Sequence, residues 1–139
     1  MFDGLKLFPI SGCGSTWKQF GSHCYKLFGD KLSWNDAQVR CEKEGSNLAS
    51  VHSLEENQFL FNLSPEGVWI GANDKAKEGT WVWTDGSAWK LENWRTGEPN
   101  NDHGNNEHCA EMKAKVQNGK WNDIQCAGPD YFPFICKKI

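Results

Sequence analysis

Five side chains with oxygen donors lie in two nearby segments of the last third of the chain. They are Glu98, Asn100, Glu107, Asn122 and Asp123. Three carboxylates and two amides offer only oxygen atoms, which suit Ca²⁺ better than Zn²⁺, since Zn²⁺ prefers nitrogen and sulfur ligands. Crowded carboxylates also repel one another unless a cation neutralises them. These residue types therefore indicate a calcium site, and the alternative is a solvated acidic loop without an ion.

The first three of these residues lie in a long segment without regular periodicity. It runs from residue 84 to residue 109 and is rich in Gly, Asn and Asp. A loop of this length inside a compact domain is usually functional or disordered. Trp89 and Trp94 within it and Cys109 at its end favour an ordered loop, because tryptophans can pack beneath it and hold it in place.

The elements that must position this loop are two helices and several strands. Ser33 can cap a helix with Asp36 as its third residue, and Ser53 with Glu56 forms a second capping box for a helix that ends before Pro65. Strands are predicted at residues 22–28, 68–72, 80–84, 109–112, 120–122 and 132–137. The predicted fold class is α+β, with mostly antiparallel strands and one large organised loop.

Composition restricts the class of protein further. The 139 residues include six cysteines, an even number without a CxxC pair, which favours disulfides in a secreted protein or a receptor ectodomain over zinc-bound cysteines in the cytosol. Eighteen acidic residues against fifteen Lys and Arg argue against a nucleic-acid partner, and the apolar runs are too short to insert into a membrane. Residues 1–12 do not resemble a signal peptide, so we expect an N-terminal extension followed by one domain at 13–139.

Four features together resemble the C-type lectin-like domain family. Trp69–Gly71 is similar to the buried WIG strand of the family, Glu98–Asn100 matches its EPN triplet, Trp121–Asp123 matches its WND triplet, and the six cysteines have the long-form order. The resemblance covers about Cys13–Lys137. A second Trp-Asn-Asp sequence at residues 34–36 lies at a predicted helix start, where capping explains it better.

The resemblance implies one of the fifteen possible pairings of six cysteines. The implied disulfides are Cys13–Cys24, Cys41–Cys136 and Cys109–Cys126. The third would join the segment that carries Glu107 to the end of the WND strand. The resemblance also implies a cis peptide bond between Glu98 and Pro99, which would direct both flanking side chains toward one ion.

The function that the resemblance implies is non-catalytic, calcium-dependent binding of carbohydrate. Two neighbouring sugar hydroxyls would complete the coordination of Ca²⁺, accept hydrogen bonds from the amides and donate hydrogen bonds to the carboxylates. In this family EPN usually accompanies mannose, fucose or N-acetylglucosamine, so terminal mannose-like glycans on microbes or other cells are the expected partners. Galactose-type specificity stays open, because Glu98 and Glu107 are nine residues apart, one more than a common spacing, and His103 or Trp94 could alter the choice. A protein-recognition module with structural calcium is the other alternative.

A second calcium ion and self-association are further expectations. Asp74 and Glu78 match family ligands and Asp102 could contribute, although His108 stands where the family often has Asp or Asn. A zinc site made by His103 and His108 is less favoured, because their spacing belongs to no strong motif. One shallow site should bind a monosaccharide with a dissociation constant of about 1 mM. We therefore expect several sites in a noncovalent homo-oligomer, since the implied pairing leaves no free cysteine.

Overall fold

The computed structural model describes residues 12–64, 66–100, 106–113 and 119–139. Within these residues the chain forms two helices, α1 (Trp34–Lys43) and α2 (Leu54–Leu63). The strands are β2 (Lys18–Phe20), β3 (His23–Leu32), β4 (Asn47–Leu48), β5 (Val68–Asn73), β6 (Val82–Trp83), β7 (Cys109–Met112), β8 (Trp121–Ile124) and β9 (Phe132–Lys138). The α+β class is confirmed. Two candidate site residues, Asp102 and His103, lie outside the described residues.

Both helices begin at the serines that the sequence predicts as caps. Ser33 Oγ accepts a 3.2 Å hydrogen bond from the Asp36 backbone N–H, and Ser53 Oγ accepts one of 3.0 Å from the Glu56 backbone N–H. Each bond satisfies a first-turn donor that has no partner within its own helix. The Trp-Asn-Asp sequence at residues 34–36 is therefore a helix start, as predicted.

The Glu56 side chain does more than a capping box requires. Its Oε1 atom accepts a hydrogen bond from the His52 backbone N–H at 2.7 Å, and its Oε2 atom accepts from Lys137 Nζ at 2.7 Å and from the Tyr25 hydroxyl. Burial by itself would raise the pKa of Glu56, but these hydrogen bonds hold it below its usual value. Because a buried ammonium group needs an anionic partner, this network ties the start of α2 to β9.

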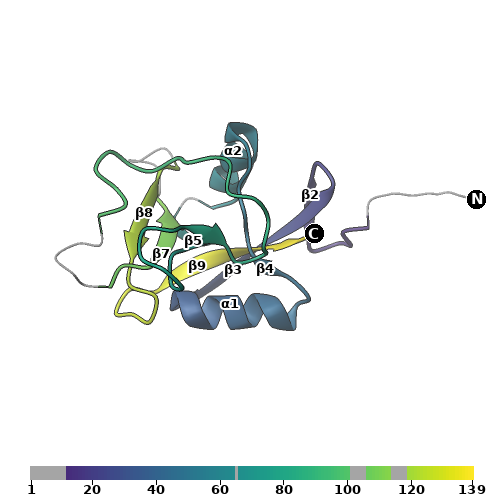
Figure 1. The fold of residues 1–139 in the computed structure, drawn as a ribbon. Coiled ribbons are helices and arrows are strands. Elements are labelled where there is room, and N and C mark those ends of the chain that lie inside the picture. Colours follow the sequence, from purple (N-terminus) through teal and green to yellow (C-terminus); the bar gives the residue numbers. More distant parts are fainter. Residues whose placement is uncertain (1–11, 65, 101–105, 114–118) are drawn as a thin grey trace, which may run out of the picture.

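The strands form one sheet in which β3 and β9 join the two ends of the domain. Its order is β2-β3-β9-β5-β7-β8, with β4 paired to β9 and β6 paired to β5. The pairs are antiparallel, except that β5 and β9 are parallel where Trp69 lies opposite Phe134. α1 and α2 lie on opposite sides of the sheet (Figure 1). The sequence analysis missed β2 and β4, because three and two residues are too few to show a strand alternation.

β5 is the strand around which the core is built, and all six of its residues are buried. Trp69 Nε1 donates a 2.8 Å hydrogen bond to the Leu32 carbonyl oxygen, which satisfies the one polar atom of this buried indole. Gly71 is required by close packing, because an added Cβ would lie 2.6 Å from the Leu48 carbonyl oxygen. β7 pairs with β5, so the core also fixes the position of β7 and of the residues that precede it.

Three disulfides close the domain. They connect Cys13 with Cys24, Cys41 with Cys136, and Cys109 with Cys126, which is the pairing that the family resemblance implies. The third joins the first residue of β7 to the segment that follows β8. It therefore holds together the two segments that carry Glu107 and Asp123.

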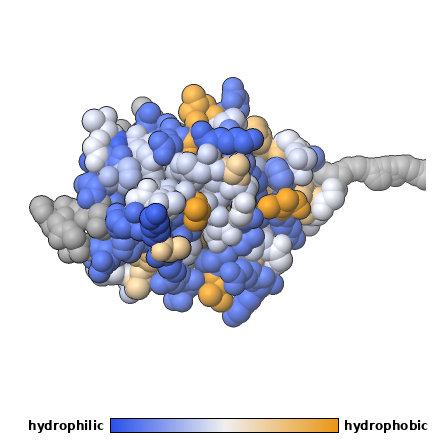
Figure 2. All heavy atoms as spheres, in the orientation of Figure 1, coloured by the Kyte–Doolittle hydropathy of each residue, from blue (hydrophilic) through white to orange (hydrophobic). Residues whose placement is uncertain are grey.

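The surface is polar on the face drawn in Figure 2, where hydrophobic residues are few and separate. Isolated apolar side chains are normal on a protein surface, so this face gives no sign of an apolar docking area. Of the helices in the described residues, neither is long and apolar enough to cross a membrane.

Candidate metal site

The loop between β6 and β7 is held against β8 by main-chain bonds and a tryptophan. The Arg95 backbone N–H donates to the Trp121 carbonyl oxygen at 2.8 Å, and the Trp121 backbone N–H donates to the Asn93 carbonyl oxygen at 2.9 Å. Trp94 lies between Asn93 and Arg95 in the sequence, and its ring centroid is 5.7 Å from that of Trp121. The loop passes the end of the molecule that carries β7 and β8 (Figure 1). These contacts place residues 98–100 beside β8.

Glu98, Asn100 and Asp123 meet where this loop reaches β8. The Asn100 backbone N–H donates to both carboxylate oxygens of Asp123, at 3.1 Å each, and the Glu98 and Asp123 side chains share a hydrogen bond. The Glu98–Pro99 peptide bond is cis, as the resemblance implies. Asp123 is only 1% exposed. Asn100 and Asp123 are 23 positions apart in the sequence and are in direct contact in the fold.

The carboxylates of this cluster perturb one another. Burial, the hydrogen bond with Asp123, and the negative charges of Asp123 and Glu107 together raise the pKa of Glu98 to about 7, although Arg95 opposes the shift. Among the described residues, Glu98 Oε1 is one of the few buried side-chain atoms without a hydrogen-bond partner. Such an atom is costly to bury unless a donor or a cation reaches it.

This donor set fits a calcium ion. The side chains that are brought together offer oxygen atoms only, and an unpartnered carboxylate oxygen lies among them. Ca²⁺ accepts carboxylate, amide and backbone oxygens in flexible geometry, and its charge would offset the repulsion that raises the pKa of Glu98. Glu107 acts on Glu98 through its charge, and its position just before β7 is compatible with the same ion.

Asn122 is held by a residue that the sequence analysis missed. It lies opposite Glu111 across the β7–β8 pair and donates a side-chain hydrogen bond to it. Because the amide nitrogen donates, the Asn122 Oδ1 atom is left as an acceptor for a cation. Burial raises the pKa of Glu111 despite the opposing ion pair with Lys113, whose Nζ lies 3.1 Å from Glu111 Oε1. The signal for Glu111 was an acid within a short, otherwise apolar strand.

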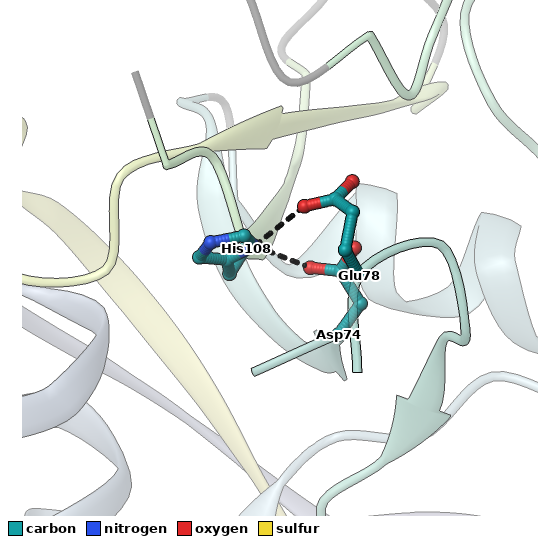
Figure 3. Close-up of side chains that lie close together, drawn as sticks. All are labelled: Asp74, Glu78 and His108. Atoms are coloured by element: carbon teal, nitrogen blue, oxygen red, sulfur yellow. Dashed lines mark hydrogen bonds and ion pairs between the residues drawn. The ribbon is translucent and has the colours of Figure 1, made fainter. Parts of the chain in front are cut away.

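The second group of predicted ligands includes His108, which the sequence analysis placed where the family often has Asp or Asn. Asp74, at the end of β5, and Glu78 both approach His108 just before β7 (Figure 3). His108 Nδ1 lies 2.9 Å from Asp74 Oδ1 and 3.2 Å from Glu78 Oε1. Asp102, the third expected calcium ligand, lies outside the described residues. An imidazole nitrogen thus occupies a place in this group where the calcium expectation calls for oxygen.

Trp94 and His103 were the residues expected to modify sugar choice. Trp94 is partly buried and packs edge-on against Trp81 and Trp121, at ring-centroid distances of 4.7 and 5.7 Å. This packing favours the role of a loop anchor over that of an exposed stacking surface. His103 lies outside the described residues, so its part in specificity stays a prediction.

A family model described as the lectin C-type domain matches residues 30–138. The chain belongs to the C-type lectin domain family. The "C-type lectin mannose-binding isoform" of Oxyuranus scutellatus is 40% identical over 133 residues, which cover 90% of this chain and 82% of the relative. The solved carbohydrate-recognition domain of cow CD23, in the presence of a GlcNAc2Man3 oligosaccharide, has a TM-score of 0.84 and 34% identity, and the match covers 94% of this chain and 98% of that one.

The same fold also occurs without calcium dependence. A calcium-independent type II antifreeze protein has a TM-score of 0.83 and 31% identity, with 91% of this chain and 93% of that chain covered. The carbohydrate-binding members of the C-type lectin domain family are non-catalytic, which agrees with the expectation that this chain is not an enzyme. Because the fold accommodates different ligands, the case for a particular ligand rests on the site residues.

Proposed function

We propose that this C-type lectin domain binds mannose-type sugars in a calcium-dependent manner, through Glu98, Asn100, Glu107, Asn122 and Asp123. The observation that supports this proposal most directly is the state of Glu98. Its Oε1 atom is buried without a partner, and its pKa is raised to about 7, with burial as the largest cause and the neighbouring carboxylates adding to it. A divalent cation at this point relieves both costs.

The five residues would hold Ca²⁺ and the sugar through different atoms. When bound, Ca²⁺ supplies positive charge and open coordination positions for two neighbouring hydroxyl oxygens. The amides of Asn100 and Asn122 would then donate hydrogen bonds to those oxygens, and the carboxylates of Glu98 and Glu107 would accept hydrogen bonds from the hydroxyl groups. A ligand without such a pair of hydroxyls leaves these groups unpaired, which weakens its binding.

The preference for mannose-type sugars has two supports. Glu98 and Asn100 keep the order of acid and amide that accompanies mannose, fucose and N-acetylglucosamine in the resemblance described above. The similar protein of Oxyuranus scutellatus is named as a mannose-binding isoform. We also propose an extracellular location, because the three disulfides require an oxidising compartment, and a noncovalent oligomer, because weak single sites need multivalency.

A glycan array with and without EDTA tests this function. We expect binding to mannose-terminated glycans in Ca²⁺ and no binding in EDTA. Asp123→Asn should lose both Ca²⁺ and glycan binding, whereas Glu55→Gln, which also removes one negative charge from an exposed helical position, should behave as wild type. Glycan binding that survives EDTA or Asp123→Asn would overturn the calcium-dependent proposal. Binding restricted to galactose-terminated glycans would overturn the mannose preference alone.

A further inference from the structure

A second cluster of metal-ligating side chains lies outside the site proposed for sugar binding. Asp74, Glu78 and His108 each offer one ligand atom, and these three atoms lie within 4.8 Å of one another. In the close-up, both carboxylates are directed toward the imidazole ring (Figure 3). The cluster draws its members from two chain segments that β5 and β7 hold side by side, since the Asp74 backbone N–H also donates to the His108 carbonyl oxygen at 2.9 Å.

The mixed donor set distinguishes this cluster from a calcium site. Ca²⁺ and Mg²⁺ take oxygen ligands, whereas one imidazole with two carboxylates suits Zn²⁺ and similar transition metals. Bonds of about 2.0–2.2 Å in tetrahedral geometry place neighbouring ligand atoms about 3.3 Å apart. The observed separations from His108 Nδ1 are 2.9 Å to Asp74 Oδ1 and 3.2 Å to Glu78 Oε1. A metal ion between these atoms would also have to accept Asp74 Oδ1 and Glu78 Oε1 together, and those two atoms lie within 4.8 Å of each other.

The surroundings of the cluster hold its most buried ligand in place. The Asp74 side chain is fully buried, and its second oxygen, Oδ2, accepts a 2.8 Å hydrogen bond from the Gly79 backbone N–H. That bond orients the carboxylate so that Oδ1 faces His108. Outer hydrogen bonds of this kind fix the direction of a metal ligand and raise its affinity for the ion.

One of the three ligands also borders a cavity. His108 lines a cavity of about 420 Å³, and Lys75 lines it as well. The Lys75 ammonium group is directed toward α1, where it donates to Asn35 Oδ1 at 2.7 Å and lies 5.1 Å from the centre of the Trp34 ring. Solvent in this cavity therefore reaches His108, one of the three proposed ligands.

We propose that Asp74, Glu78 and His108 form a site for Zn²⁺ or a related transition-metal ion in place of a second calcium ion. The three protein ligands leave one position open, which is the arrangement of an exchangeable rather than a closed structural site. This inference does not depend on the proposed function, because none of its three ligands belongs to the sugar site. The competing interpretation is that the close contacts of His108 with the two acids are the whole role of the cluster and that no metal binds.

Calorimetric titration of the full chain with ZnCl₂ in saturating Ca²⁺ tests the proposal, since Ca²⁺ blocks the first site. We expect one Zn²⁺ per chain, with affinity lowered at least about 100-fold in His108→Asn and unchanged in His23→Asn, which removes an imidazole elsewhere. Co²⁺ should give the visible absorption of a low-coordinate nitrogen-and-oxygen site in wild type and lose it in His108→Asn. Unfolding temperatures in EDTA check that both variants fold.

His108→Asp provides the reciprocal test, because it makes the cluster all-oxygen. We expect this variant to lose Zn²⁺ affinity and to bind one more Ca²⁺ per chain than wild type. The proposal is overturned if wild type takes up no Zn²⁺ in saturating Ca²⁺ or if His108→Asn binds it as tightly as wild type. Failure of the sugar site would appear differently, as absent Ca²⁺ binding, while His108→Asn would still lower the Zn²⁺ affinity.

Discussion

Calcium affinity should fall steeply as the pH falls below about 7, because Glu98 takes up a proton in that range. Burial and the nearby Asp123 and Glu107 carboxylates raise the pKa of Glu98 to about 7. Calcium needs the ionised carboxylate, so proton and ion compete. For a pKa of about 7, the apparent affinity is reduced about 2-fold at pH 7, about 10-fold at pH 6 and about 100-fold at pH 5, relative to high pH. An ordinary glutamate would cause almost no change above pH 5.5.

Isothermal titration of Ca²⁺ between pH 5 and pH 8 measures this dependence. Repeating the titration in buffers with different ionisation enthalpies counts the released protons, and we expect about half a proton per Ca²⁺ at pH 7. Glu98→Gln should bind Ca²⁺ more weakly throughout but should lose the step between pH 8 and pH 6, whereas Glu55→Gln should keep it. A wild-type affinity that changes less than about threefold from pH 8 to pH 6, without proton release, would refute the reasoning.

The same raised pKa has a consequence for folding stability in EDTA. Since the folded pKa of Glu98 lies above its unfolded value, protonation favours the fold, and this contribution is present below pH 4.5 and is lost as the pH rises through about 7. His52 acts in the opposite direction, because burial lowers its pKa and the neutral ring is favoured in the fold. The Glu98→Gln variant keeps His52, so the His52 contribution is the same in both proteins. Subtracting the variant's free energy of unfolding from that of the wild type at each pH leaves the contribution of Glu98. Urea unfolding in EDTA at pH 5 and pH 8 measures the difference.

Other predictions concern specificity, support of the site and the core. Glu98→Gln combined with Asn100→Asp should shift preference from mannose toward galactose in monosaccharide inhibition, and unchanged preference would count against the hydroxyl-pairing account. Glu111→Met keeps the side-chain volume but removes the hydrogen-bond acceptor for Asn122. The Ca²⁺ affinity measured by calorimetry should therefore fall about 10- to 100-fold. An unchanged affinity would mean that Asn122 does not need this hydrogen bond. Gly71→Ala should destabilise the fold by about 1–3 kcal/mol in urea unfolding, because the new Cβ meets Leu48 O, whereas Gly29→Ala has open space and should not show this steric penalty.

The sequence predicted those parts of the fold that local chemistry decides. Ser33 and Ser53 begin the two helices because a serine hydroxyl can accept a hydrogen bond from a first-turn N–H. The residues that form this cap lie within four positions of each other, so the sequence alone indicates it. The bounds of β7 were also correct, since apolar character and Cys109 mark its start. β2 and β4 were not predicted, because these short strands form by pairing with the longer β3 and β9 and have no clear sequence pattern of their own.

The candidate site was predictable in its membership more than in its geometry. The carboxylates and amides of Glu98–Asn100 and Asn122–Asp123 can be identified as possible ligands from their residue types. Their contact in the fold depends on main-chain hydrogen bonds between the loop and β8, which no local sequence pattern indicates. The orienting bond from Asn122 to Glu111 was missed for the same reason, whereas the place of His108 beside Asp74 was implied by the family resemblance. The bond from Asn122 joins residues that only the pairing of strands brings together, and the metal ligation itself stays a prediction.

The most direct test of the calcium-dependent sugar site is a crystal structure of the protein grown with Ca²⁺ and a methyl mannoside. The account predicts one Ca²⁺ ligated by Glu98, Asn100, Glu107, Asn122 and Asp123, with two neighbouring sugar hydroxyls on the same ion. Mannoside bound elsewhere, or these five side chains without an ion at saturating Ca²⁺, would contradict it.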